Sequence, residues 1–105
     1  AATEYNARGV TEKQTKYISN IAIDGANGMI TVTSATTGAS GLPTDAQSKT
    51  ITLTPNVQGA VLAAGITGAI DWACASAANT TATGRNLVVG AAGTMPVKYA
   101  PSECR

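Results

Sequence analysis

The two cysteines, Cys74 and Cys104, are the residues whose chemistry the sequence predicts best. No other cysteine occurs among the 105 residues, and charged residues make up only 12% of the chain. Chains that are rich in Thr, Ala and Gly, poor in charge and carry one cysteine pair are typical of exported proteins, where such a pair forms a disulfide. One disulfide is therefore the main prediction, and two unrelated reduced thiols are the alternative. A disulfide here closes a loop of about 30 residues and stabilises the fold by about 3–4 kcal/mol.

Catalytic chemistry has few candidate residues. The chain has no histidine, which excludes Ser-His-Asp and Cys-His relays and histidine-bearing zinc sites. Asp71 and Glu103 are a candidate carboxylate pair, but each lies close to a cysteine in the sequence, so solvated charges flanking a disulfide are the favoured interpretation. Gly84, Gly90 and Gly93 do not form a phosphate-binding loop or a dinucleotide fingerprint. The sequence therefore predicts no enzyme, no metal site and no cofactor.

Composition also narrows the class of partner. The net charge is +1, so we expect no basic surface that would attract the phosphates of a nucleic acid. No apolar run approaches the roughly 20 residues that cross a bilayer, and no signal peptide is recognisable at the start. A chain of this length forms one domain, and with no Phe and one Trp its core is thin. A disulfide or a partner surface would therefore add much to its stability.

The elements that must position these residues are mainly β-strands. Residues 17–23 and 29–34 are rich in β-branched residues and flank an Asp-Gly and an Asn-Gly pair, which predicts a β-hairpin. Residues 49–55 alternate between apolar residues and threonine. In that strand we expect the apolar residues Ile51 and Leu53 to point inward and the threonines outward. Its last residue is a proline, which is expected to end the strand because it cannot donate to a ladder.

The remaining segments have weaker signals. Residues 69–74 are expected to form a fourth strand with its apolar residues on one face. Residues 1–16 and 35–48 are interpreted as loops, the first with a frayed helix end. Residues 56–68 are interpreted as a loop or one short helical turn, because two glycines weaken a helix there. The result is an antiparallel sheet of about four strands, followed by a loop that a disulfide would close.

One face of the predicted sheet has no cover. A sheet with an apolar face needs another layer packed against it. The chain contains no long amphipathic helix that could supply that layer. Either two sheets pack face to face, or a helix is missing from the N-terminal side.

Several short motifs occur in an order that identifies a family. The hairpin of residues 16–33 is followed by the alternating strand of residues 49–55 and by Trp-x-Cys at residues 72–74, and the chain closes with Pro-Ser-x-Cys-Arg at residues 101–105. In this order the motifs resemble the globular head of type IV pilins. The resemblance is specifically to the type IVa major pilins of Gram-negative bacteria such as Pseudomonas and Neisseria. It covers most of residues 13–105.

The resemblance implies an α+β fold in a single domain, residues 1–105. Residues 1–16 would be the remnant of the αβ-loop, residues 17–74 a four-stranded antiparallel sheet, and residues 75–105 the D-region bounded by a Cys74–Cys104 disulfide. In the family a long N-terminal helix packs across the sheet, and here it is largely absent. Membrane contact would occur only through that missing helix.

The resemblance also implies a function. The chain would be a structural subunit of an extracellular type IV pilus, a homo-oligomeric fibre used in adhesion, twitching motility and DNA uptake. It would lie in the inner membrane before assembly and at the cell surface afterwards.

The alternative is an adhesin-like binding module whose disulfide-bounded loop recognises a host surface glycan. This loop is longer than the compact pilin loops on which such binding was inferred. The candidate contact residues in it are Gly84, Arg85, Asn86, Gly93, Thr94, Met95, Pro96 and Lys98.

Overall fold

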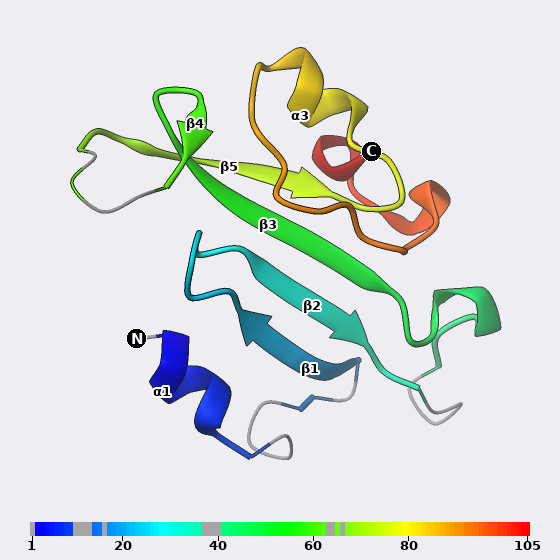
Figure 1. The fold of residues 1–105 in the computed structure, drawn as a ribbon. Coiled ribbons are helices and arrows are strands. Elements are labelled where there is room, and N and C mark those ends of the chain that lie inside the picture. The colour runs from blue at the N-terminus through cyan, green and yellow to red at the C-terminus, as the bar shows by residue number, and fades with distance from the viewer. Residues whose placement is uncertain (1, 10–13, 16, 37–40, 63–64, 66) are drawn as a thin grey trace.

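The computed structural model of this chain describes residues 2–9, 14–15, 17–36, 41–62, 65 and 67–105. These residues form an α+β fold whose strand pairs are all antiparallel (Figure 1). The helices and strands, in chain order, are α1 (Ala2–Ala7), β1 (Ile18–Ile23), β2 (Ile30–Ser34), η2 (Thr44–Ala46), β3 (Thr50–Val57), β4 (Ala60–Val61), β5 (Ile70–Ala75), α3 (Thr80–Gly84), η3 (Val97–Tyr99) and η4 (Ser102–Cys104), where η marks a 3₁₀ helix. Among these residues, no helix is long and apolar enough to span a membrane.

The long strand β3 is the centre of the sheet (Figure 1). It pairs with β2 from Thr50 to Leu53, and β2 pairs in turn with β1 at the edge. It also pairs with β5 from Thr52 to Val57, and its last two residues pair with the short β4. The predicted antiparallel sheet of four main strands is therefore confirmed, with β4 as an addition that the sequence did not indicate.

The first hairpin forms where the sequence predicts it. The Asp24 N–H donates to the Met29 carbonyl at 2.8 Å, and the Gly28 N–H donates to the Asp24 carbonyl at 2.8 Å. Gly28 has a φ of 74°, a left-handed conformation that glycine adopts without steric cost. The Asn-Gly pair therefore fixes the register in which Ile23 lies opposite Ile30.

The prediction that Pro55 ends its strand is wrong, because β3 continues to Val57. The Pro55 carbonyl accepts a hydrogen bond from Leu62 N–H at 3.2 Å, so the main chain of Pro55 faces away from β5. The proline therefore lies beyond the part of β3 that pairs with β2, which ends at Leu53. No ladder bond to β2 or β5 is lost there.

The segment after β3 is also not the predicted loop or helical turn. Gln58 and Gly59 have φ values of 54° and 76°, and together they turn the chain into β4. Two residues with positive φ form the type of turn whose twist matches the strands of a hairpin. A glutamine is an unusual residue at such a position, which is why the sequence pattern did not indicate a turn there.

The expectation that the threonines of β3 face solvent is wrong. Thr54 has no exposed surface and Thr52 is 3% exposed. The C-terminal loop lies over this face of the sheet and buries both side chains. The apolar side chains Ile51 and Leu53 lie on the other face, where they pack against the buried cluster of Cys74, Ala100 and Cys104.

In the other half of the apolar face, Pro55 and Val57 of β3 are buried, but the β5 side chains beside them are open to solvent. Trp72 is 44% exposed and Ile70 is 53% exposed, although each lies opposite an apolar residue of β3. The helix α1 lies beside β1, and α3 lies beside β5 and η4, so neither covers this half (Figure 1). Within the described part of the chain, the sheet thus keeps the uncovered apolar surface that the sequence predicts.

Candidate functional site: the disulfide-bounded loop

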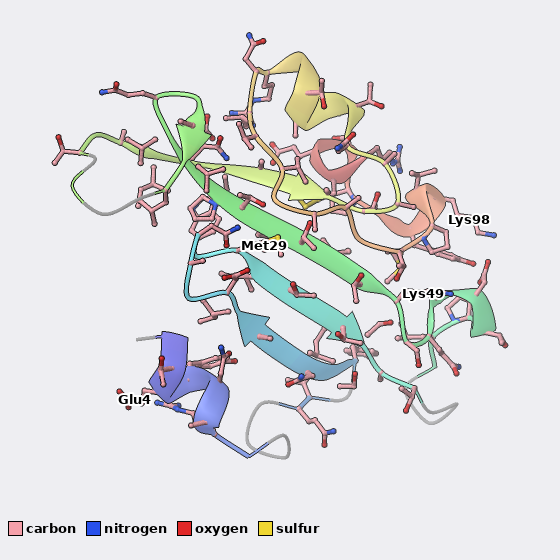
Figure 2. All side chains as sticks on the ribbon, viewed as in Figure 1. Glu4, Met29, Lys49 and Lys98 are labelled. Atoms are coloured by element: carbon pink, nitrogen blue, oxygen red, sulfur yellow. A yellow bond between two sulfur atoms is a disulfide. The ribbon has the colours of Figure 1, made fainter. Side chains whose placement is uncertain are left out.

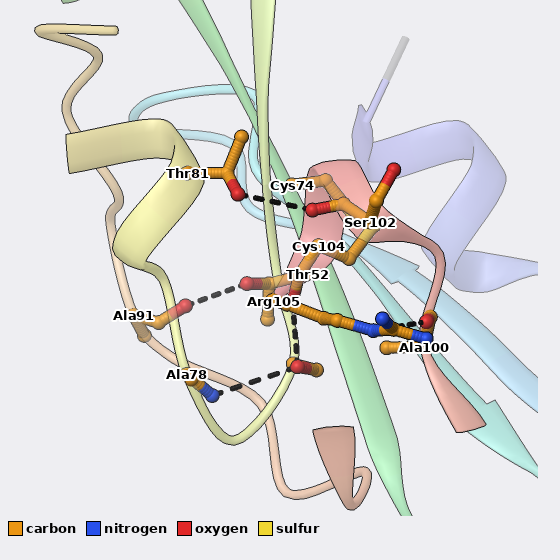
Figure 3. The surroundings of a disulfide bond; sticks show 10 residues. Thr52, Cys74, Ala78, Thr81, Ala91, Ala100, Ser102, Cys104 and Arg105 are labelled. Carbon is orange, nitrogen blue, oxygen red and sulfur yellow. Dashed lines mark hydrogen bonds between the residues drawn. A yellow bond between two sulfur atoms is a disulfide. The ribbon is translucent and has the colours of Figure 1, made fainter. Parts of the chain in front are cut away.

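Cys74 and Cys104 form the predicted disulfide (Figure 3). Their Cα atoms are 4.6 Å apart and the bridge spans 30 positions of sequence. Cys74 projects from β5 onto the apolar face, and both cysteines are buried. The bridge therefore fixes η4 directly against the sheet and bounds the loop that contains the candidate contact residues.

Hydrogen bonds fasten the end of the chain beside the disulfide. The carbonyl of Cys104 accepts bonds from the Ser76 N–H at 2.9 Å and from the Ser76 hydroxyl. On the other side, the Thr81 hydroxyl donates to the Ser102 carbonyl at 3.0 Å, and the Thr81 N–H donates to the Arg105 main-chain oxygen at 2.9 Å (Figure 3). Residues 102–105 are thus held between β5 and α3 by bonds that do not depend on the disulfide.

Arg105 is exposed, but its side chain folds back on the preceding turn. Its Nε donates to the carbonyls of Val97 at 3.1 Å and Ala100 at 3.0 Å. Nε carries a single N–H, so the two carbonyls share one bifurcated bond, which ties Arg105 to the turn between η3 and η4. Its role in the described structure is therefore to shape the loop.

Residues 88–94, here called the strap, cross the threonine face of β3. Asn56 is fully buried, and its side-chain amide bonds both main-chain groups of Val88: the Nδ2 donates to the carbonyl, and the Oδ1 accepts from the N–H, each at 2.9 Å. The Thr54 hydroxyl accepts from the Gly90 N–H at 3.0 Å, and the Thr52 hydroxyl donates to the Ala91 carbonyl at 2.6 Å. Alternate side chains of β3 thus satisfy successive main-chain groups of the strap.

The strap ends in a close approach to the first residue of β3. Thr94 N–H and Met95 N–H both donate to the Thr50 carbonyl, at 2.9 and 3.0 Å. The Thr50 N–H donates in turn to the Thr94 hydroxyl at 2.9 Å. Next to this exchange, a Cβ at Gly93 would overlap the Thr50 carbonyl. A glycine is therefore required where the loop joins the sheet.

Two exposed ion pairs connect the loop to other elements. Arg85 Nη2 lies 3.1 and 2.9 Å from the two carboxylate oxygens of Asp71, which joins the end of α3 to β5. Both side chains are about half exposed, so solvent and salt screen this pair. It is an orienting contact rather than a large contribution to stability.

The second ion pair joins the loop to the segment between β2 and β3. Lys98 Nζ lies 2.9 Å from Asp45 Oδ2, and the Tyr99 hydroxyl donates to Asp45 Oδ1 at 2.8 Å. The Lys98 hydrogen bond, followed by that from Tyr99, lowers the pKa of Asp45, and the hydrogen bond to Asp45 raises the pKa of Lys98. These three residues are here called the Asp45 cluster. Lys98 lies at the end of the molecule where β3 begins (Figure 2).

The candidate contact residues separate into two groups. Gly84, Arg85, Asn86, Thr94 and Lys98 are exposed. Gly93, Met95 and Pro96 are partly buried, and the first two are tied to β3 or packed against it. The second group and Thr94, which is bonded to Thr50, thus shape the loop, whereas the rest of the first group faces outward.

The sequence did not single out several residues that organise this site. Asn56, Thr52 and Thr54 hold the strap, and Asp45 and Tyr99 connect it to a distant loop. The alternation in residues 49–55 was the available signal for the threonines, but polar side chains were assigned to solvent. Nothing local marks Asp45 or Tyr99, because they are 54 positions apart in sequence.

Asp71 and Glu103, the candidate carboxylate pair, do not lie together in the structure. Asp71 is paired with Arg85 on β5, and Glu103 lies exposed in η4. Within the described residues, no group of three or more acidic, cysteine or histidine side chains is arranged to hold a metal ion.

Comparisons with known proteins agree on one family. A family model for pilin, the protein of a bacterial filament, matches residues 1–105. A crystal structure of a Pseudomonas aeruginosa type IV pilin is 36% identical in sequence and superposes with a TM-score of 0.79. The match covers 99% of this chain and 75% of that chain. No curated protein sequence matches this chain significantly.

Proposed function

This chain belongs to the pilin family of bacterial filament proteins, and we propose that its filament is a type IV pilus that serves adhesion, twitching motility and DNA uptake. Pilins are structural proteins that assemble as many copies of one subunit, so the chain is a pilus subunit at the cell surface rather than an enzyme. The observation that carries the proposal is the arrangement of the head, in which the strap fastens the loop to the threonine face of the sheet, the disulfide fastens it to the apolar face, and Trp72 and Ile70 leave part of the apolar face open.

The open apolar face is the place for the N-terminal helix that the family resemblance implies. Trp72 and Ile70, exposed by 44% and 53%, would be covered by an apolar helix lying across β3 and β5. Fully burying an exposed large apolar side chain is worth about 1.5–3 kcal/mol, and covering these two, already about half buried, contributes correspondingly less. Assembly through such a helix would place the disulfide-bounded loop on the outside of the filament.

The test of the helix uses the full-length subunit beside this 105-residue chain. Trp72 is the only tryptophan of these 105 residues, so the fluorescence of the short chain reports on this face alone. In the full-length subunit we expect a blue-shifted emission and weak quenching by iodide, and in the short chain a red-shifted emission and strong quenching. Equal quenching in both proteins would contradict a helix on this face.

A second function, binding to a host surface glycan through the loop, is favoured by one observation. Val88, Val97 and Tyr99 belong to the loop and are 39–42% exposed, although the backbone around them is held by many hydrogen bonds. A rigid loop that presents apolar and aromatic groups loses little entropy when a partner binds. The same groups are equally suited to contact neighbouring subunits.

Substitution in the loop distinguishes the two roles. Val97→Ser and Tyr99→Ser remove the exposed side chains, and Ala92→Ser is a matched change at another exposed position of the loop. Filament number on the cell surface and attachment to host cells are measured separately for each variant. Lost attachment with normal filaments supports glycan binding, whereas lost filaments support a contact between subunits.

A further inference from the structure

The strand β1 has the composition of a segment that pairs readily with other strands. It lies at the edge of the sheet, where one row of main-chain groups faces away from β2. Residues 17–23 contain three isoleucines and a tyrosine, and no proline, glycine or charged residue. Uncharged segments of six or seven residues with high β propensity, placed at a sheet edge, are templates for pairing with another chain.

The side chain of Asn6 occupies one end of this edge. Its Nδ2 donates to the Ile23 carbonyl at 2.6 Å, and its Oδ1 accepts from the Ile23 N–H at 2.9 Å. An amide side chain thus makes the two bonds that a residue of a neighbouring strand would make. The short helix α1 carries Asn6 and lies beside β1 (Figure 1).

The other end of the edge is occupied by Thr15. Its N–H donates to the Ile18 carbonyl at 2.9 Å, and its hydroxyl accepts from the Ile18 N–H at 3.1 Å. Next to it, the register between β1 and β2 shifts between Ile18 and Asn20. Irregular pairing of this kind bends an edge strand and makes it a poorer template.

In the regular part of β1, which begins at Asn20 after the register shift, only Ile21 lies between the two ends with both main-chain groups directed outward. Asn20 and Ala22 direct theirs toward β2, as the hydrogen bonds of the hairpin and the alternation of the strand require. Within the described residues, the N–H and C=O of Ile21 have no hydrogen-bond partner. One free residue is too short a stretch for a second strand to pair with.

We propose that Asn6 and Thr15 cap the edge of β1 and thereby prevent two copies of this chain from joining through it. Without the Asn6 cap, Ile21 and Ile23 would each present an unbonded N–H and C=O outward. If a second copy pairs antiparallel with β1 across a two-fold axis, Ile21 of each copy lies opposite Ile23 of the other, and the two Ala22 residues lie opposite each other. Along residues 20–23 no like charges then face each other.

The opposite edge of the sheet is closed only beyond the end of β5. There the Ser76 N–H is bonded to the Cys104 carbonyl, and the Ser76 carbonyl accepts from the Gly93 N–H. For a subunit that assembles with copies of itself, caps on β1 exclude a sheet-to-sheet pairing that would compete with ordered assembly.

The test is the oligomeric state of the Asn6→Ala variant of this chain. Sedimentation velocity over a wide range of concentration is expected to show a species approaching twice the monomer mass of 10.5 kDa, while the unmodified chain stays monomeric. Amide exchange at Ile23 is measured in dilute, monomeric samples, where it is expected to be faster in the variant. Asn79→Ala is the matched control, since Asn79 forms no side-chain cap on α3 and lies far from β1 in sequence.

A second variant separates pairing through β1 from general loss of structure. In Asn6→Ala combined with Ala22→Lys, two lysines would lie directly opposite each other in the paired strands, so the double variant is expected to be monomeric. Dimers that persist in the double variant overturn the proposal, because they form elsewhere. The proposal is also overturned if the Asn6→Ala variant stays monomeric at every concentration, or if its Ile23 amide exchanges no faster than in the unmodified chain.

Discussion

Gly93 lies directly against the carbonyl of Thr50, and a Cβ at position 93 would come within 2.9 Å of the Thr50 carbonyl carbon. The Thr50 oxygen also accepts the N–H groups of Thr94 and Met95, so it cannot move away without breaking both bonds. The contact joins the disulfide-bounded loop to the first residue of the central strand. Its tightness makes position 93 a sensitive probe of how the loop is attached.

Gly93→Ala is expected to lower the free energy of unfolding by about 1–3 kcal/mol, the usual cost of inserting a group into a packed site. Urea denaturation measures it. Gly84→Ala is the matched control, because an added Cβ there meets nothing within 4 Å. That control should be neutral or slightly stabilising, since alanine is favoured over glycine in a helix. Equal stability of the two variants would show that the strap is not packed as described.

Asn56→Ala is expected to release the other end of the strap. The buried amide forms two bonds with Val88, and its loss leaves the N–H and C=O of Val88 to find water. The expected cost is about 1–3 kcal/mol. Hydrogen exchange at Val88 and Gly90 should become faster in this variant, while exchange in the β1–β2 hairpin should not change. Unaltered exchange at Val88 would refute a role for Asn56 in holding the strap.

Removing the disulfide by the double change Cys74→Ala and Cys104→Ala should cost about 2–5 kcal/mol, because the bridge closes a long loop. A shift of about 4–8 °C in melting temperature is expected for each kcal/mol. Reduction of the unmodified chain under denaturing conditions, followed by thiol titration, provides the control for the oxidised state. A melting temperature that is the same with and without the bridge would contradict the prediction.

The strands could be predicted from the sequence because their signals are local. The Asn-Gly turn before Met29 and the alternation around Ile51 each depend on neighbouring residues only, and both elements formed where expected. The missing cover of the apolar face was predictable for the same reason. The sequence did not predict which groups form hydrogen bonds with the polar side chains of β3.

The burial of Thr52 and Thr54 depends on residues more than 30 positions further along the chain. A threonine on a strand is compatible with either solvent or a buried partner, and the alternation pattern does not distinguish them. Likewise, the pairing of Asp45 with Tyr99 arises only after the loop has docked. The sequence therefore predicted the framework and the disulfide but not the contacts that shape the outer surface.

The Asp45 cluster makes the attachment of η3 dependent on pH. The pKa of Asp45 is lower in the folded chain than in the unfolded chain, chiefly because Lys98 and then Tyr99 form hydrogen bonds with it. The unfolded chain therefore binds more protons in acid, so the contribution of Asp45 is present above the unfolded pKa and is lost as the pH falls through the folded pKa.

Lys98 also makes stability depend on pH, but its contribution is lost as the pH rises rather than as it falls. The pKa of Lys98 is raised by the hydrogen bond to Asp45, so its contribution is complete below the unfolded pKa and disappears as the pH rises through the folded pKa. Between these limits the cluster is intact. Because all three side chains are exposed, solvent screening keeps the effect small and salt weakens it further.

Asp45→Asn should therefore flatten the acid limb of the stability curve, because it slightly lowers stability at neutral pH, where ionised Asp45 contributes, and leaves stability in strong acid nearly unchanged. The measurement is the urea midpoint as a function of pH at low and high salt, compared with Asp24→Asn as a second exposed aspartate. The protection of the Tyr99 amide, which is its intrinsic exchange rate divided by the observed rate at the same pH, should fall in acid in the unmodified chain and should be low at every pH in Asp45→Asn. If both aspartate variants followed the same acid limb as the unmodified chain, the cluster would not be the pH-dependent attachment of η3.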